Sequence, residues 1–214
     1  MTVSRTVLRE QVKELLLERI MRGEYEPGDR LVETRIAQEL GTSQAPVREA
    51  LRDLELLRLV ESEPFRGARV RAISDEEIAE IYPVRAALEE VAAREAARRL
   101  DPETDGRLAD EIEAMRRAAD AGDLHEQVEH DVQFHRLMIE ASGNRTLLEV
   151  WASLGVEART VMTLLKTRVD RRRLAEMHQP ILDALRTGDP GLAGRVARAH
   201  VEGFRDLLLE GEPS

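Results

Sequence analysis

Residues 60–71 hold two short segments with β-strand character on either side of a Pro-Phe-Arg-Gly turn, and no comparable pair follows them. This pattern predicts one small β-hairpin. From Ser74 onward the apolar residues keep helical spacing in every segment. The chain is therefore expected to be mainly α-helical. It is also expected to divide into an N-terminal module over residues 1–72 and an all-helical module over residues 73–214.

The order of elements in the first module is that of a winged helix-turn-helix. Apolar spacing and turn residues predict three helices ahead of the hairpin, over residues 4–22, 33–40 and 44–58. In such a module the third helix fits the major groove of DNA, and the preceding helix braces it across the backbone. The sequence therefore predicts that this module binds double-stranded DNA.

The expected DNA contacts lie at the starts of the second and third helices and at the tip of the hairpin. Ser43 is expected to cap the third helix, so that its free N–H groups and positive dipole end face a phosphate. The wing tip is thin enough to enter a minor groove. For Arg48 taken alone, an ordinary solvated arginine explains the pattern equally well. The predicted contacts are Arg35, Ser43, Gln44, Ala45, Pro46, Arg48, Arg66 and Gly67.

Composition excludes several other classes of protein. The 42 acidic side chains outnumber the 32 basic ones, and the net charge of −10 argues against a general nucleic-acid coat protein. Residues 1–72 are balanced in charge, so the excess negative charge lies in the second module. The absence of cysteine removes disulfide scaffolds, cysteine-based zinc fingers and thiol nucleophiles. With no long apolar run, a soluble, cytoplasmic protein is expected.

Turn signals divide the second module into six or seven helices, the pattern of an antiparallel α-helical bundle. Ser74 and Glu77 form a capping box for a helix that is expected to reach about Leu100, with an interruption near Pro83. Later breaks are expected at Gly122-Asp123, at Gly143-Asn144, over residues 167–170 and over residues 188–191.

Four polar side chains occupy positions on helix faces that are otherwise apolar. Asp131 and His135 stand one turn apart in one helix, and His178 and His200 take similar places in two later helices. Such groups need partners, because an unpaired buried carboxylate costs several kcal/mol. One carboxylate and three neutral imidazoles suit Zn²⁺, Ni²⁺ or a similar ion. The sequence therefore predicts a divalent-metal site.

A simpler interpretation is a set of core histidines that are satisfied separately, with Asp131 paired to His135. The main rival ligand is His130, which lies on a neighbouring face with Phe134 and Leu137. His125 is expected to be solvated.

The stretch PGDRLVETRIAQELGTSQAPVREALRDLELLRLV, ending in the wing FRGARV, resembles the DNA-binding domain of GntR-type bacterial transcription regulators. The resemblance implies DNA contacts by Arg35, Arg48, Arg66 and Gly67. Many members carry arginine where this chain has Gln44, a residue better suited to adenine than to guanine. A different operator sequence is therefore expected.

The stretches DVQFHRLMIEASGN and MHQPILDALRTGDPGLAGRVARAH resemble the helical ligand-binding domain of the FadR-type branch of this family. The resemblance implies a metal held by Asp131, His135, His178 and His200, a small organic acid as effector, and a homodimer. It also implies that Arg85 helps to hold the acid, although a surface ion pair with Glu89 would explain Arg85 as well. Pro83 departs from the usual non-proline residue.

The leading interpretation is a dimeric, repressor-type regulator that binds a palindromic operator and responds to a small carboxylate at the metal site. A metal-sensing repressor, in which the ion is the signal, would use the same ligands. A metal-dependent hydrolase is a third class, but no acid is spaced like the general base of an HExxH motif. The chain is therefore not expected to be an enzyme.

Overall fold

The computed structural model describes residues 5–63, 67–166 and 169–210. The chain divides into two compact units, Met1–Ile73 and Ser74–Ser214. Each unit buries its own set of apolar side chains. No helix in the described part of the chain is both long and apolar enough to cross a membrane.

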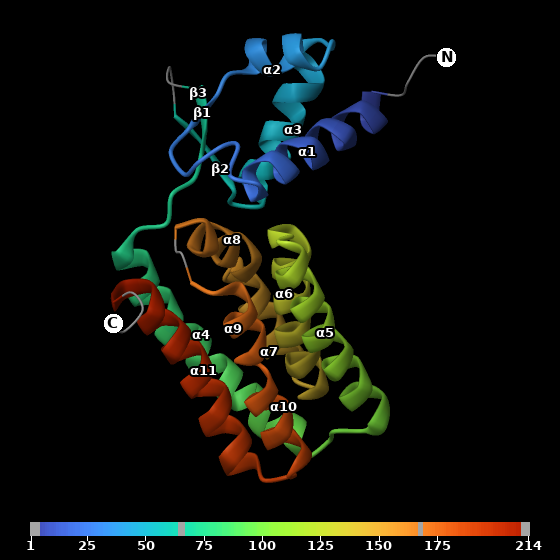
Figure 1. Ribbon diagram of the computed structural model, residues 1–214, viewed down its shortest axis with the longest axis vertical. Coiled ribbons are helices and arrows are strands. Elements are labelled where there is room, and N and C mark those ends of the chain that lie inside the picture. Colours follow the sequence, from blue (N-terminus) through green and yellow to red (C-terminus); the bar gives the residue numbers. More distant parts are fainter. Residues whose placement is uncertain (1–4, 64–66, 167–168, 211–214) are drawn as a thin grey trace. The chain divides into compact units, whose positions relative to one another are not determined.

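The N-terminal unit has the predicted winged helix-turn-helix fold (Figure 1). Helix α3 forms because Val47, Ala50, Leu51 and Leu54 recur at helical spacing and are all buried. The elements are α1 (Arg5–Met21), β1 (Arg30–Leu31), α2 (Glu33–Glu39), α3 (Gln44–Leu56), β2 (Val60–Glu63) and β3 (Gly67–Val70).

The wing contains a strand that the sequence does not predict. Strand β1 pairs with β3 in an antiparallel sheet of order β1-β3-β2. The preceding turn is fixed to β3 as well, because the N–H of Gly28 donates to the carbonyl of Val70 and the N–H of Val70 donates to that of Asp29, both at 2.9 Å. A strand of two residues is too short to show an alternating pattern.

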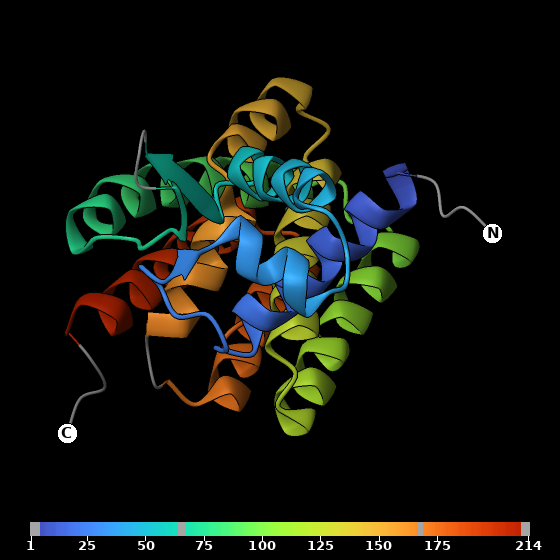
Figure 2. The ribbon, with the colours of Figure 1, turned by 90° about the horizontal axis from the view of Figure 1, so that it is seen from above.

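The second unit is the predicted bundle of helices. Helices α4 and α11 lie side by side along their length, and α5 lies along α6 (Figures 1 and 2). Helix α10 packs against α4, α5 and α11. The helices are α4 (Asp75–Ala97), α5 (Pro102–Ala121), α6 (Leu124–Ala141), α7 (Arg145–Ser153), α8 (Val156–Lys166), α9 (Arg171–Glu176), α10 (Gln179–Arg186) and α11 (Pro190–Glu210).

Polar side chains begin several of these helices by accepting a hydrogen bond from the first turn. The Ser74 hydroxyl accepts from the N–H of Glu77 at 3.1 Å, as the capping box predicts. Asp101, Asp123 and Asn144 accept in the same way at the starts of α5, α6 and α7. These caps fix the ends of the helices that carry the site.

The predicted interruption near Pro83 is wrong, because α4 continues through this residue. Pro83 lacks the N–H that would bond to the preceding turn, and this costs helix stability. Its side chain is exposed, whereas Ile78, Tyr82 and Ala86 around it are buried. Packing of that apolar face therefore outweighs the loss of one hydrogen bond on the solvent side.

Two segments that the sequence presents as continuous are each divided, so the described residues form eight helices here instead of six or seven. Gly155, with φ of 62°, follows α7 and separates it from α8. Pro180 lies in the first turn of α10. In a continuous helix its ring would clash with the carbonyl of Glu176, so α9 ends at Glu176 and a new helix begins after His178.

Replacing Pro83 by Ala should raise the free energy of unfolding of the helical unit by about 1–3 kcal/mol, because it restores a helix hydrogen bond at an exposed site. Urea unfolding followed by Trp151 fluorescence measures the change. Val84→Ala is the matched control at the neighbouring exposed position, with an expected change within about 0.5 kcal/mol. A destabilised Pro83→Ala protein would show that α4 needs the proline.

Candidate functional site

Three histidine rings from separate parts of the helical unit meet in its interior. His135 lies in α6, His178 lies between α9 and α10, and His200 lies in α11. Their ring centroids are 4.5–5.2 Å apart. One ring nitrogen from each lies within 4.8 Å of the others. The fold therefore brings together the three histidines that the sequence singles out.

The outer nitrogen of each of the three rings faces an acceptor atom. His178 Nδ1 is 3.1 Å from the carbonyl oxygen of Leu174, and His200 Nδ1 is 3.1 Å from that of Met177. His135 Nδ1 is 2.8 Å from Oε2 of Glu89. A backbone carbonyl or an ionised carboxylate can only accept, so the proton of a neutral ring at each of these positions belongs on Nδ1. The Nε2 lone pairs are then free to bind a cation.

Burial favours the neutral form of two of these rings. It lowers the pKa of His135, although Glu89 acts in the opposite direction. It also lowers the pKa of His200 to well below the usual value, and the neighbouring rings of His178 and His135 add to this effect. Neutral imidazoles are the form that binds metal ions.

Asp131 adds a carboxylate to the group. Its Oδ1 is 3.1 Å from His178 Nε2, which also lies 3.3 Å from His135 Nε2. Burial opposes ionisation of Asp131, but its contact with His178 and the nearby Arg85 outweigh this, so its pKa is lowered. A single proton on His178 Nε2 points at only one of its two neighbours, whereas a metal cation is attractive to all of these atoms.

Glu89 is the residue of the site that sequence reasoning missed. Its side chain is fully buried, and its Oε1 accepts from Arg85 Nε at 2.6 Å and from Trp151 Nε1 at 2.9 Å. Burial alone would raise the pKa of Glu89. The charge of Arg85 and the contact with His135 outweigh burial and lower this pKa below its usual value, so Glu89 stays ionised. An available signal was the spacing of Tyr82, Arg85 and Glu89 on the face of α4 that is otherwise rich in alanine.

The Arg85–Glu89 pair is therefore real, but it does not lie on the surface. Only 6% of the Arg85 side chain is exposed. Burial works against its charge, yet Glu89 and other nearby acidic groups outweigh burial and raise its pKa. A buried pair of this kind holds both side chains in one arrangement, because any movement that separates them leaves two buried charges without a partner.

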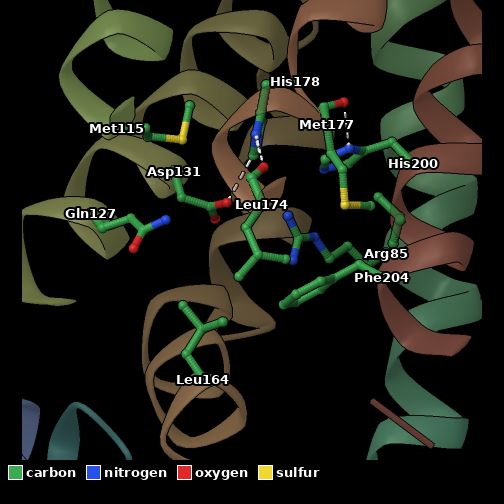
Figure 3. A pocket seen from close by; sticks show the side chains of 11 residues that line it. Arg85, Met115, Gln127, Asp131, Leu164, Leu174, Met177, His178, His200 and Phe204 are labelled. Atoms are coloured by element: carbon green, nitrogen blue, oxygen red, sulfur yellow. Dashed lines mark hydrogen bonds and ion pairs between the residues drawn. The ribbon is translucent and has the colours of Figure 1, made fainter. Parts of the chain in front are cut away.

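A cavity opens beside the histidines (Figure 3). It has about 430 Å³ of empty space, including the part open to solvent. Arg85, Asp131, His178 and His200 line its polar part. A small ligand in this space would therefore contact both the candidate metal ligands and Arg85.

The other two histidines do not join this group. His130 Nδ1 is 2.7 Å from Oε2 of Glu111, and both side chains are only partly buried. The structure does not place this rival ligand with the three converging rings. His125 is half-buried and not fully solvated as expected.

The predicted DNA-contact residues of the N-terminal unit differ in exposure. Gln44, Arg35 and Arg48 are exposed, Ala45 is half-buried and Pro46 is buried. Arg48 donates through Nε and Nη2 to the carboxylate of Glu33, with the shortest contact at 2.8 Å. Arg35 Nε donates to Glu39 at 3.0 Å. Both arginines lie in exposed ion pairs, which are weak enough to exchange for phosphate or base contacts.

One expectation about this surface needs adjustment. Ser43 is the N-cap residue of α3, but its hydroxyl makes no capping hydrogen bond. Its extended backbone ends the turn, and the side chain is left at the surface. Gly67 begins β3 with φ of 80°, a conformation that favours glycine. Arg66 lies outside the described residues.

Comparison with known proteins gives matches over most of the chain. Residues 8–70 match the family model of bacterial regulatory proteins of the gntR family, and residues 80–203 match the FCD domain. A probable D-xylose utilization operon transcriptional repressor from Paenarthrobacter nicotinovorans is 36% identical over 202 residues, or 94% of this chain and 89% of that protein.

Two further proteins extend the comparison. The gluconate operon transcriptional repressor of Bacillus subtilis is 31% identical over 181 residues, covering 81% of this chain and 74% of its own length. The solved structure of Escherichia coli McbR/YncC aligns over 97% of this chain and 98% of that chain, with a TM-score of 0.70 and 26% identity.

Replacing Glu89 by Gln should lower the free energy of unfolding of the helical unit by about 3–5 kcal/mol, because Arg85 loses its buried counter-charge. Trp151 is the one tryptophan in the chain and bonds to Glu89, so its fluorescence reports on this unit during urea unfolding.

Glu90→Gln is the matched control for this substitution. Glu90 pairs with Arg94 and Arg198 in a more exposed position, so its replacement should lower the free energy of unfolding by at most about 1 kcal/mol. Equal losses in the two variants would contradict a special role for Glu89.

Proposed function

This chain belongs to the GntR family of bacterial transcription regulators, in the branch with an FCD domain, and we propose that it is a repressor controlled by a carboxylate ligand at a metal ion. It is a DNA-binding transcription regulator and not an enzyme. The observation that carries the proposal is the convergence of His135, His178 and His200 beside a cavity.

We assign DNA binding to the exposed residues at the starts of α2 and α3 and to the wing. Gln44 and Arg48 lie in the first turns of α3, where an inserted helix contacts base edges. Arg35 lies near the start of the bracing helix α2 and suits a phosphate. Ser43, Ala45, Arg66 and Gly67 complete the set, and the buried Pro46 shapes the start of α3.

We assign metal binding to Asp131, His135, His178 and His200. The donor set of one carboxylate and three imidazoles fits Zn²⁺ or Ni²⁺, because each neutral ring can present a bare Nε2. When bound, the ion would supply the positive charge that holds the carboxylate of an effector. Arg85 would act on the same carboxylate from the cavity wall.

The cavity favours an effector over the ion itself as the signal. A site that serves only to detect a metal needs no space beyond its ligands, whereas this one adjoins a cavity lined by Arg85 and apolar side chains. Control by a ligand also requires a connection to the DNA-binding unit. Helix α4 carries Arg85 and begins at Asp75, directly after the boundary between the two units.

An ion pair ties the start of α4 to a helix that lines the cavity. Arg159 of α8 contacts Glu77 in the first turn of α4 at 3.1 Å. Leu164 of the same helix lines the cavity. Effector binding that shifts α8 would therefore act on the first turn of α4, and the ligand must bind the DNA-competent and incompetent states with different affinities.

We propose that two copies act together on a palindromic operator. One helix-turn-helix reads a short half-site, so two-fold symmetry in the protein matches two-fold symmetry in the DNA. The similar proteins named as operon repressors support the repressor assignment.

Replacing Arg48 by Ala should weaken binding to a DNA site selected from a random pool by about 1–3 kcal/mol, if Arg48 reads a base. Fluorescence anisotropy measures the affinity. The control is Arg22→Ala, because Arg22 lies outside α2, α3 and the wing, and it should change the affinity for DNA little. Affinity of the unaltered protein should also fall steeply between about 50 and 200 mM salt. A flat salt response would contradict DNA binding through phosphates.

Replacing His178 by Ala should remove most of the bound metal and leave the helical content largely intact. Metal analysis after exchange into zinc should give one ion per chain before the change and a small fraction of that after it. His130→Ala is the control and should keep full occupancy, because His130 contacts Glu111 instead. Full occupancy in the His178 variant, with loss in the His130 variant, would reverse the ligand assignment.

A further inference from the structure

We propose that the effector is a monocarboxylate with a compact apolar body, and that sugar acids and dicarboxylates are poor ligands. This inference rests on the proposed function, because it takes the histidine group to hold a divalent ion. It goes further by naming the chemical class that the cavity selects. Two independent features carry it, namely the balance of buried charge and the character of the cavity walls.

The buried charges leave room for one negative charge. A divalent ion and Arg85 together bring three positive charges, and the carboxylates of Glu89 and Asp131 bring two negative ones. Neutral imidazoles contribute none. One further carboxylate therefore balances the site, whereas a second would enter a poorly solvated space where the described lining residues offer no further cation.

Arg85 is oriented to meet that carboxylate. Its Nε is engaged by Glu89 at 2.6 Å, and the guanidinium points toward the cavity between Asp131 and Phe204 (Figure 3). The ion pair fixes this orientation, since both side chains are buried. A carboxylate beside the metal ligands can therefore bridge the ion and the guanidinium.

Apart from Gln127, the rest of the cavity wall is apolar. It is formed by side chains from α5, α8, α11 and the segment around α9, and Figure 3 shows Leu164 and Phe204 on the side away from His178. Buried apolar walls gain affinity from apolar ligand surface. The apolar lining residues are Met115, Leu164, Leu174, Met177, Val201 and Phe204.

Polar ligand atoms would find few partners against these walls. Gln127 lines the cavity, but its side-chain nitrogen donates to the carbonyl of Arg171 at 2.8 Å, which fixes the amide. Its Oε1 is one acceptor without a partner among the described residues. A polyhydroxylated acid would bury several hydroxyls here, and each unpaired one costs roughly a factor of ten in affinity.

The test is calorimetric titration of the zinc-loaded full chain with five probes. Benzoate and hexanoate carry one carboxylate and an apolar body, gluconate carries hydroxyls, phthalate carries a second carboxylate, and benzamide lacks the charge. At least one of benzoate and hexanoate should bind, ten-fold or more tightly than gluconate and phthalate. Benzamide should show no measurable binding.

A pair of matched variants tests the wall directly. Leu164→Gln places a polar group in the cavity and should weaken the bound monocarboxylate five-fold or more without loss of zinc. Val150→Gln makes the same kind of change on α7, at an exposed position outside the cavity, and should leave the affinity unchanged.

Three results would overturn the inference. Gluconate or phthalate binding as tightly as the monocarboxylates would contradict the selected class. If neither benzoate nor hexanoate binds to protein that holds one zinc ion per chain, the proposed effector class is also contradicted. The proposals of a metal site and of DNA binding would still stand. Protein that cannot hold zinc at all would overturn the metal site itself and this inference with it.

Discussion

Glu89 lies at the centre of the helical unit, where its carboxylate is contacted by Arg85, His135 and Trp151. A buried carboxylate is costly unless several donors share it, and these three come from α4, α6 and α7. Glu89 thereby fixes the direction of Arg85 and turns the Nε2 of His135 toward the other two rings. The rest of the site depends on this one interaction, because it sets both the metal-facing nitrogen and the ligand-facing guanidinium.

The remaining ligands are fixed by the backbone near them. His178 lies where Pro180 prevents a continuous helix, so the segment around it leaves the carbonyls of Leu174 and Met177 to hold two imidazoles. The ligands of the site therefore come from helix interiors and one helix junction. Rigid ligands favour specific binding, because little conformational freedom is lost when the ion or effector enters.

Much of this arrangement was predictable from the sequence, and the failures have physical causes. Periodicity identified the helices and the faces on which Asp131, His135 and His200 lie, since burial follows the helical repeat. It did not reveal the junction at His178 or the passage of α4 through Pro83, because both depend on how packing weighs against one lost hydrogen bond. The burial of Glu89 could not be predicted, because an (i, i+4) pair with Arg85 has the same spacing on the surface and in the core.

The central claim is that three histidines direct their Nε2 atoms to one point, where a metal ion can bind. Long-range proton–nitrogen NMR of the imidazole nitrogens, recorded on the chelator-treated and the zinc-loaded protein, tests it most directly. The structure predicts that His135 and His200 are protonated on Nδ1 alone near neutral pH, and that the Nε2 resonances of all three rings shift together when zinc binds. Protonation of His135 or His200 on Nε2, or Nε2 resonances that zinc leaves unchanged, would contradict the account.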